Sequence, residues 1–202
     1  MKAEEIEADA DGWATRHVVA QMKRTDRDKD WPMVTGLGRQ LWERDNPLGV
    51  LHLTDPETLS AAWPATPSGL RARLATRRPL LRALDTTPAL GRLELERLLA
   101  LERLVWERVN EQRHERYRRA WTAFFRQWRR EEDWEWPTAE AFWQQHRRLS
   151  EAVHRHRLPP DPLAGLGPGS LVEAALIGVA TVARATRDEI DQVLPPVEEL
   201  LP

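Results

Sequence analysis

The chain has 202 residues, 41% of them hydrophobic and 31% charged, and a net charge of −2 at pH 7. This length supports a domain with a hydrophobic core, and the absence of cysteine excludes a disulfide framework, a thiolate metal site and a cysteine nucleophile. No apolar run approaches the roughly 18 residues that a membrane span needs, and the acidic start MKAEEIEADAD is unlike a secretory signal, so we expect a cytoplasmic protein without membrane attachment.

The residue pattern predicts an all-α fold, an irregular helical bundle of about seven helices. Leucine, alanine, arginine and glutamate recur at helical spacing, and only residues 49–54, GVLHLT, are candidates for a short strand. We divide the chain into an acidic N-terminus (1–12), an N-terminal helical segment (13–66), a main helical bundle (67–194) and a tail (195–202).

The first predicted helix runs from near Gly12 to Met22, with Trp13, Val18, Val19 and Met22 as its buried candidates. A cluster of alternating charges, MKRTDRDKD at residues 22–30, follows it; we call this cluster the charged junction. Its residue types are typical of a helix end followed by a turn, so a purely structural role accounts for the pattern.

A second helix is predicted to begin after the charged junction. Asp30 is expected to cap it by accepting hydrogen bonds from backbone amides of the first turn. Pro32 is compatible with this position, because amides of the first turn have no hydrogen-bond partner within the helix. Asp55 and Pro56 repeat this arrangement and predict a third helix ending near Trp63. The inward face of the second helix is expected to consist of Val34, Leu37, Leu41 and Trp42.

The longest predicted helix spans about residues 88–132, because no glycine or proline interrupts residues 92–136. A straight helix of this length measures about 68 Å, more than the roughly 43 Å of a compact chain of this size, so we expect it to bend or protrude. Residues 110–116, NEQRHER, are the expected bend or exposed span because they add nothing to the apolar stripe. That stripe is predicted to comprise Leu98, Leu101, Val105, Val109, Tyr117, Trp121, Phe124 and Trp128.

The last predicted helix, at about 171–193, is apolar nearly all round and is expected to be the buried central helix. Ser170 and Glu173 match the capping-box pattern at its start.

Positive charge is concentrated in the middle of the chain, where residues 71–130 hold 16 arginines and 7 acidic residues. This asymmetry fits a nucleic-acid surface, and it fits equally a basic segment compensated by acidic neighbours. Helical projection places the aromatic and arginine side chains of residues 116–130 on opposite sides, which favours aromatics in the core over a stacking platform. A phosphate-binding face would then consist of Arg116, Arg119, Arg126 and Arg130.

Two catalytic or metal-binding alternatives rest on histidine spacing. The pairs Arg108/His114, Arg147/His154 and Arg148/His154 resemble the arginine–histidine motif of the HEPN ribonuclease family, which implies RNA cleavage by side chains that meet across a dimer. The pairs Glu111/His114 and Glu151/His154 resemble the unit that ferritin-like metal-binding bundles use twice. The chain has no nucleotide-binding or nucleophile motif, so we expect no cofactor.

The stretch MKRTDRDKDWPMVTGLGRQL resembles the helical segment that follows the catalytic sheet in small nucleotidyltransferase-like proteins of prokaryotic toxin–antitoxin and defence loci. The matching positions are Lys23, Arg27, Lys29 and Asp30, and the resemblance covers about residues 13–53. It implies a helical remnant without the catalytic part, because too few residues precede it to form the sheet.

We therefore expect a non-catalytic helical protein that binds a protein partner or a second copy of itself, with RNA binding as the alternative. The residues predicted to contact a partner are Lys23, Arg27 and Lys29 of the charged junction, and Trp134, Trp136 and Trp143 near an acidic turn.

Overall fold

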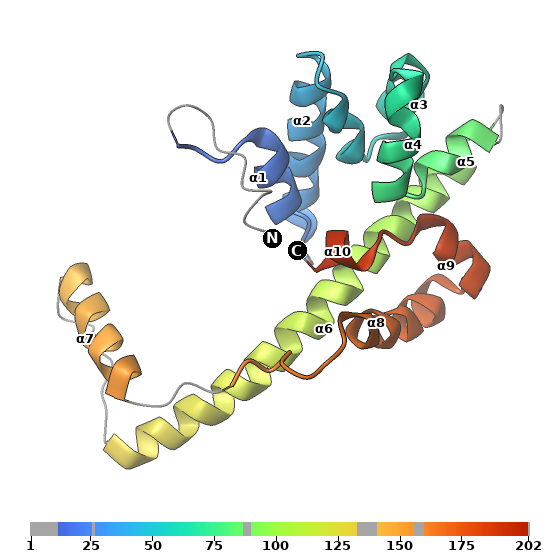
Figure 1. Cartoon of the computed structure of the whole chain (residues 1–202). Helices are drawn as coiled ribbons and strands as arrows, with labels where there is room; N and C mark the ends of the chain where they lie inside the picture. The colour runs from blue at the N-terminus through green and yellow to red at the C-terminus, as the bar shows by residue number, and fades with distance from the viewer. Residues whose placement is uncertain (1–11, 26, 87–89, 133–140, 156–159, 202) are drawn as a thin grey trace. The chain divides into compact units, whose positions relative to one another are not determined.

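The structure is a computed structural model of the chain. It describes residues 12–25, 27–86, 90–132, 141–155 and 160–201, with the side chains of Thr86, Trp128, Leu149 and residues 131–132 and 152–155 left out. Within these ranges the predicted all-α class is confirmed: they contain ten α-helices and two short 3-10 helices, η2 and η3, and no strand (Figure 1).

The elements follow one another in this order: α1 (Arg16–Met22), η2 (Asp28–Asp30), α2 (Trp31–Trp42), η3 (Pro47–Leu51), α3 (Pro56–Ala65), α4 (Ser68–Arg77), α5 (Leu81–Thr86), α6 (Arg92–Glu132), α7 (Phe142–Arg155), α8 (Pro168–Ala183), α9 (Arg187–Val193) and α10 (Val197–Leu200). The chain forms two compact units. Unit 1 comprises residues 1–112 and 167–202, and unit 2 comprises residues 113–166.

The hydrophobic core of unit 1 forms around the N-terminal half of α6. Leu98, Leu101, Val105 and Val109 are all buried, as the apolar stripe predicted, and they pack with side chains of α3, α5, α8 and α9. Burying each such side chain contributes roughly 1.5–3 kcal/mol, so this half of α6 is the main stabilising element of unit 1.

Helix α1 is shorter than predicted, and two of its expected core residues are exposed. The helix begins at Arg16, with Thr15 as its N-cap, so Trp13 lies outside it and is 74% exposed. Met22 is 63% exposed, whereas His17 and Val18 are buried. The sequence pattern failed here because a helix of seven residues presents only two turns, and its buried face includes a histidine that periodicity counts as polar.

Residues 49–54 do not form a strand. Residues 47–51 form the 3-10 helix η3, which packs tightly against α2. The contact is close because Gly38 of α2 faces Gly49 of η3: a Cβ on Gly49 would lie 2.6 Å from the carbonyl oxygen of Gly38. Two glycines on separate elements thus allow backbone-to-backbone contact at this point.

Helix α6 runs without interruption through residues 110–116, where we expected a bend or an exposed span. The boundary between the two units falls within that span, between Gln112 and Arg113. Asn110 is buried, because its side-chain amide donates to the carbonyl oxygens of Arg24 (2.9 Å) and Trp106 (3.0 Å). A polar residue next to Val109 therefore belongs to the buried face of α6.

The apolar helix predicted at 171–193 is in fact two helices, α8 and α9, which meet at a sharp turn (Figure 1). Arg184 ends α8 in the left-handed conformation, with φ 52° and ψ 39°. The predicted capping box at Ser170 is wrong, because Gly167 is the N-cap of α8 and its cap has no side-chain hydrogen bond. A true capping box starts α9 instead, formed by Thr186 and Glu189.

Helix α8 is also less buried than its composition suggested. Leu171, Val172 and Val179 face the core, whereas Ile177 is 73% exposed and Val182 57% exposed. Across the described ranges no single helix is long and apolar enough to cross a membrane; α8 and α9 meet both conditions only together, as a pair bent by 113°.

Candidate functional site

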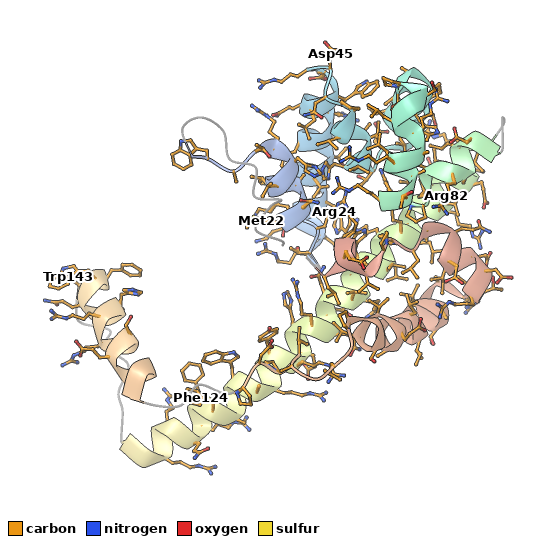
Figure 2. The ribbon with its side chains drawn as sticks, viewed as in Figure 1. Met22, Arg24, Asp45, Arg82, Phe124 and Trp143 are labelled. Carbon is orange, nitrogen blue, oxygen red and sulfur yellow. The ribbon has the colours of Figure 1, made fainter. Side chains whose placement is uncertain are left out.

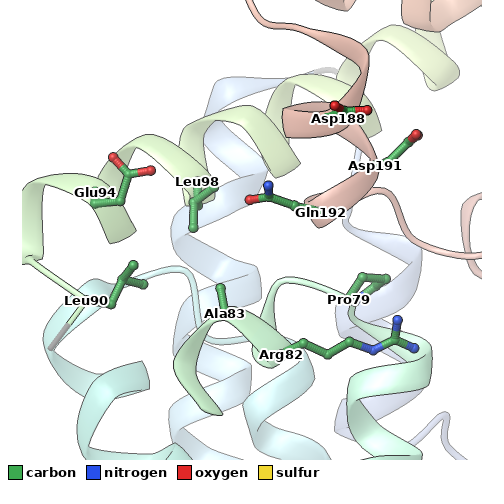
Figure 3. Close-up of a pocket in the computed structure, with 9 residues that line it drawn as sticks. All are labelled: Pro79, Arg82, Ala83, Leu90, Glu94, Leu98, Asp188, Asp191 and Gln192. Carbon is green, nitrogen blue, oxygen red and sulfur yellow. The ribbon is translucent and has the colours of Figure 1, made fainter. Parts of the chain in front are cut away.

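A hollow in unit 1 lies between α5, the start of α6 and α9, and has a volume of about 640 Å³ (Figure 3). We call it the acidic hollow. Its apolar part includes the buried Leu98 and the half-buried Leu90, Ala83 and Pro79. Its size falls within the range of small-molecule or peptide sites. The polar residues that line it are Arg82, Glu94, Asp188, Asp191 and Gln192.

The carboxylates of the acidic hollow line the same side of it, with Glu94 at one end and Asp188 and Asp191 at the other. Figure 3 shows Glu94 on α6 and Asp188 and Asp191 on α9 along one wall, with Arg82 on the facing wall. Glu94 accepts a hydrogen bond from Arg97 (3.3 Å) and Asp191 accepts one from Arg187 (2.8 Å). Asp188 has no hydrogen-bond or ion-pair partner among the described residues. The hollow therefore combines an apolar floor with an excess of negative charge.

Unit 2 carries the segment 113–130, the C-terminal part of α6, which holds seven arginines and one glutamate. We call it the basic segment. Its aromatic side chains pack on one another: the ring centroids of Trp121, Phe124 and Phe125 lie 5.7–5.8 Å apart. The hydroxyl of Tyr117 donates to Asp161 (3.0 Å), and this bond raises the pKa of the phenol.

The aromatic part of the predicted stripe is only partly buried, which corrects the expectation of a buried aromatic face. Tyr117, Trp121 and Phe124, the last labelled in Figure 2, are half-buried, and Phe125 is 38% exposed. The side chain of Trp128 lies outside the description. Segregation of aromatic from charged residues along a helix therefore does not establish that the aromatic side is enclosed.

The arginines of the basic segment differ in how they are engaged. Arg118 and Arg119 both form ion pairs with Glu115, and the hydrogen bonds that they donate lower its pKa. Arg116 is half-buried. The exposed arginines of the last turns, Arg126, Arg129 and Arg130, have no hydrogen-bond or ion-pair partner within the described ranges. Of the predicted phosphate-binding residues, Arg119, Arg126 and Arg130 are thus on the surface.

Helix α7 of unit 2 exposes two adjacent aromatic side chains at its start. Phe142 is 84% exposed, and Trp143, labelled in Figure 2, is 60% exposed. The guanidinium of Arg147 lies over the Trp143 ring, 5.3 Å from its centroid. Of the tryptophans predicted to contact a partner, Trp143 is therefore on the surface, and Trp134 and Trp136 lie outside the described residues.

The charged junction is held together by its own side chains. The Asp30 carboxylate accepts from the Thr25 hydroxyl (2.8 Å) and from Arg27 (2.8 Å), and the Thr25 bond lowers its pKa. Asp30 makes no side-chain cap to α2, which corrects that prediction. Of the junction residues predicted to contact a partner, Lys29 and Arg27 are exposed and Lys23 is half-buried.

The residue that sequence reasoning missed in the junction is Arg24. It donates to Nδ1 of His52 (2.9 Å) and to the carbonyl oxygen of Leu51, and it lies over the Trp106 ring, 4.9 Å from its centroid. Burial lowers the pKa of Arg24 to about 10, so it stays charged at neutral pH. Spacing gave no signal for this contact, because its partners are 27 and more residues away.

Two buried histidines complete this contact. Nδ1 of His17 lies 2.7 Å from Nε2 of His52, and the Arg77 side chain, which forms an ion pair with Glu199, lies 3.5 Å from His17. Burial, and then the charge of Arg77, lower the pKa of His17 to about 4. Burial also holds the pKa of His52 well below its usual value, followed by the charge of Arg24. Both imidazoles are therefore neutral at pH 7 and act as fixed polar links in the core.

The catalytic pairs predicted from the HEPN-like motif are not brought together within one chain. Arg108 and His114 are six residues apart on α6, which places them on faces about 120° apart. Arg148 and His154 have the same separation on α7, and the side chain of His154 lies outside the description. Arg108 is itself engaged by Glu111, at 2.5 Å.

The predicted metal site would require the pairs Glu111/His114 and Glu151/His154. Among the residues whose side chains are described, no group of three or more histidine, aspartate or glutamate side chains could hold a metal ion. Glu111 is occupied by Arg108, and Glu151 is exposed on α7.

Comparison of the chain with protein-family models, with curated proteins and with solved structures gave no match.

Proposed function

We propose that this chain is a non-catalytic helical binding protein, and that the exposed aromatic and arginine side chains of unit 2 hold a protein partner. The observation that carries the proposal is the exposure of neighbouring large aromatic residues, Phe142 and Trp143, at the start of α7. Phe125 and the stacked Arg147 add to the same chemistry within unit 2.

The physical reason is that large aromatic side chains stabilise a protein most when they are removed from water. Aromatic residues and arginine are enriched where protein surfaces bind one another, because each supplies a large contact area at a small entropic cost. A surface that keeps Phe142 and Trp143 in water loses that stabilisation until a partner covers it.

The proposal includes an origin from a nucleotidyltransferase-type module of a prokaryotic toxin–antitoxin or defence locus. Its support is the resemblance at Lys23, Arg27, Lys29 and Asp30, together with the all-helical structure of the described residues. On this view the helical part was retained for binding, and catalysis is not carried over to this chain.

The test is affinity purification of the tagged full-length chain from cells of its source, with identification of the bound proteins by mass spectrometry. The double variant Phe142→Ser/Trp143→Ser should lose a specific partner that the unaltered chain retains. Ile177→Ser is the matched control, because Ile177 is equally exposed but lies on α8 of unit 1. Retention of every bound protein by the double variant would refute this use of the surface.

RNA binding remains the second candidate, and one observation favours it. Arg126, Arg129 and Arg130 are exposed and have no protein partner among the described residues, so their charges are available to phosphates. Binding to single-stranded RNA by these three residues should weaken steeply with salt, and the triple change to glutamine should reduce the log–log slope by roughly 2. A filter-binding titration of nuclease-free protein against an RNA oligonucleotide measures this slope.

A further inference from the structure

The acidic hollow has the chemistry of a site for an aliphatic or aromatic group that carries a positive charge. Its floor includes Leu98, Leu90 and Ala83, while Asp188 and Asp191 extend from α9 at its edge (Figure 3). An uncharged apolar ligand would leave the unpartnered Asp188 beside a low-dielectric surface. A cationic ligand would pair with the Asp188 carboxylate, and the apolar floor would accommodate the hydrocarbon part of the ligand.

The same chain carries a segment with the complementary chemistry. In the basic segment, Phe125 and Arg129 are four residues apart and share one face of α6, so the segment presents an aromatic ring next to a guanidinium. Arg126 and Arg130 lie beside them at the same spacing. Phe125 is 38% exposed and none of these arginines has a partner in the described part of the chain.

The spacing of the charges also agrees. Asp188 and Asp191 are one helical turn apart on α9, a rise of about 4.5 Å, and Arg126 and Arg129 are one turn apart on α6, with the same rise. Two helices that run alongside each other at this point can therefore bring two pairs of opposite charges together. Bidentate pairing of arginine with carboxylate favours such an arrangement over lysine.

We infer that the acidic hollow of one copy receives the Phe125–Arg130 end of the basic segment of a second copy, so that the protein associates with itself. The inference rests on the proposed function, that unit 2 binds a protein, and it names a second copy of the chain as a partner of the basic segment. Because hollow and segment are different surfaces, the contact is head-to-tail, and each copy offers both halves. Phe125 covers the apolar floor, and Arg126 and Arg129 pair with Asp188 and Asp191.

The experiment is sedimentation equilibrium of nuclease-treated full-length protein, at about 50 mM and about 500 mM salt. We expect concentration-dependent association that weakens at least tenfold at the higher salt. Two charge-reversal variants should each be monomeric: Asp188→Lys/Asp191→Lys in the hollow, and Arg126→Glu/Arg129→Glu in the basic segment. An equimolar mixture of the two should associate again, because each variant retains one unaltered surface.

Glu43→Lys/Glu198→Lys is the control, because it changes the net charge by the same amount at exposed sites outside the hollow. The single variant Asp188→Lys covers the case in which the double change prevents folding, since Asp188 makes no hydrogen bond or ion pair among the described residues. Circular dichroism verifies the fold of every variant.

Several results would overturn the inference. A monomer at every concentration in low salt would do so. So would an association that occurs before nuclease treatment and disappears after it, a result that would favour RNA as the ligand. If reversal of the basic segment removes association while reversal of the hollow does not, the inference fails but the proposed function stands. Affinity purification measures the partner of Phe142 and Trp143 separately. A failure of the inference is therefore distinguishable from a failure of the proposed function.

Discussion

His17 and His52 form a hydrogen bond in the core of unit 1, with 2.7 Å between Nδ1 of His17 and Nε2 of His52. The partners of the pair decide where its protons are. Arg24 can only donate, so Nδ1 of His52 is an acceptor, the hydrogen of the neutral ring is on Nε2, and that nitrogen donates to His17. His17 then carries its own hydrogen on Nε2, so the Arg77 side chain, 3.5 Å from that nitrogen, cannot donate a hydrogen bond to it. A second proton on His17 would place two N–H groups opposite each other.

We predict that the protein loses stability as the pH falls from about 6.5 towards 4. The unfolded chain takes up a proton on His17 near its ordinary pKa of 6.5, whereas the folded pKa of His17 is about 4. Between these values the unfolded state binds more protons than the folded state. The free energy of unfolding therefore decreases as the pH is lowered, by on the order of 3 kcal/mol for His17 alone. Urea denaturation at pH 7.0, 5.5 and 4.5 measures this change.

Carboxylates do not account for a loss between pH 6.5 and 4.5. Glu189, for example, has its pKa lowered to about 2 mainly by the hydrogen bond from Arg97, so its contribution is present above its unfolded value of 4.5 and is lost only below it. In the variant His17→Asn the decline above pH 4.5 should be smaller. Unfolding free energies that stay constant from pH 6.5 to 4.5 in the unaltered protein would contradict the assignment.

Much of the fold was predictable from local patterns. The stripe from Leu98 to Val109, the helix that starts after Asp55 and the all-α class follow from periodicity and caps, and Asp55 does accept from the amides of Glu57 and Thr58. These features depend on residues within a few turns of one another, which a sequence pattern records directly.

The remaining features depend on partners far away in the chain. Asn110 and Arg24 are both polar, so periodicity placed them on the surface, yet they contact each other across 86 residues. The acidic hollow likewise combines residues near 80–98 with residues near 190, and no local pattern links them. What could have been noticed is that Asp188 and Asp191 share one helical face.

A second prediction concerns the ion pair between Arg78 and Glu102. Both side chains are buried, and Arg78 donates to both carboxylate oxygens of Glu102 (2.8 and 2.6 Å) and to the carbonyl oxygens of Val50 and Leu53. Arg78→Met should lower the free energy of unfolding by about 3–5 kcal/mol, because it leaves a buried charge unpaired.

The exposed pair of Arg92 and Glu57 is the matched control for this measurement. Their side chains are 66% and 70% exposed, so Arg92→Met should change the free energy of unfolding far less than Arg78→Met does. Chemical denaturation of both variants compares them. If both variants lowered the free energy of unfolding equally, burial would not determine how much an ion pair contributes to stability.

A third prediction tests the contact between α2 and η3. A Cβ on Gly49 would lie 2.6 Å from the carbonyl oxygen of Gly38 and 2.7 Å from the backbone nitrogen of Trp42, and neither backbone atom can turn aside. Gly49→Ala should therefore destabilise the protein by about 1–3 kcal/mol or more. Gly36→Ala, in α2 with open space around its Cβ, should stabilise it by about 0.5–1 kcal/mol. Thermal denaturation should show shifts of opposite sign.

The last prediction concerns Arg184, which ends α8 with φ 52°. A residue with a Cβ in this left-handed conformation costs roughly 1–2 kcal/mol, whereas glycine adopts it freely. Glycine also gives the unfolded chain more freedom, which offsets part of the gain. Arg184→Gly should therefore stabilise the protein by up to about 1 kcal/mol, measured by urea denaturation. Arg184→Ala removes the same exposed side chain but keeps the Cβ, so it should give no gain; equal stability of the two variants would show that the backbone at this turn is unstrained.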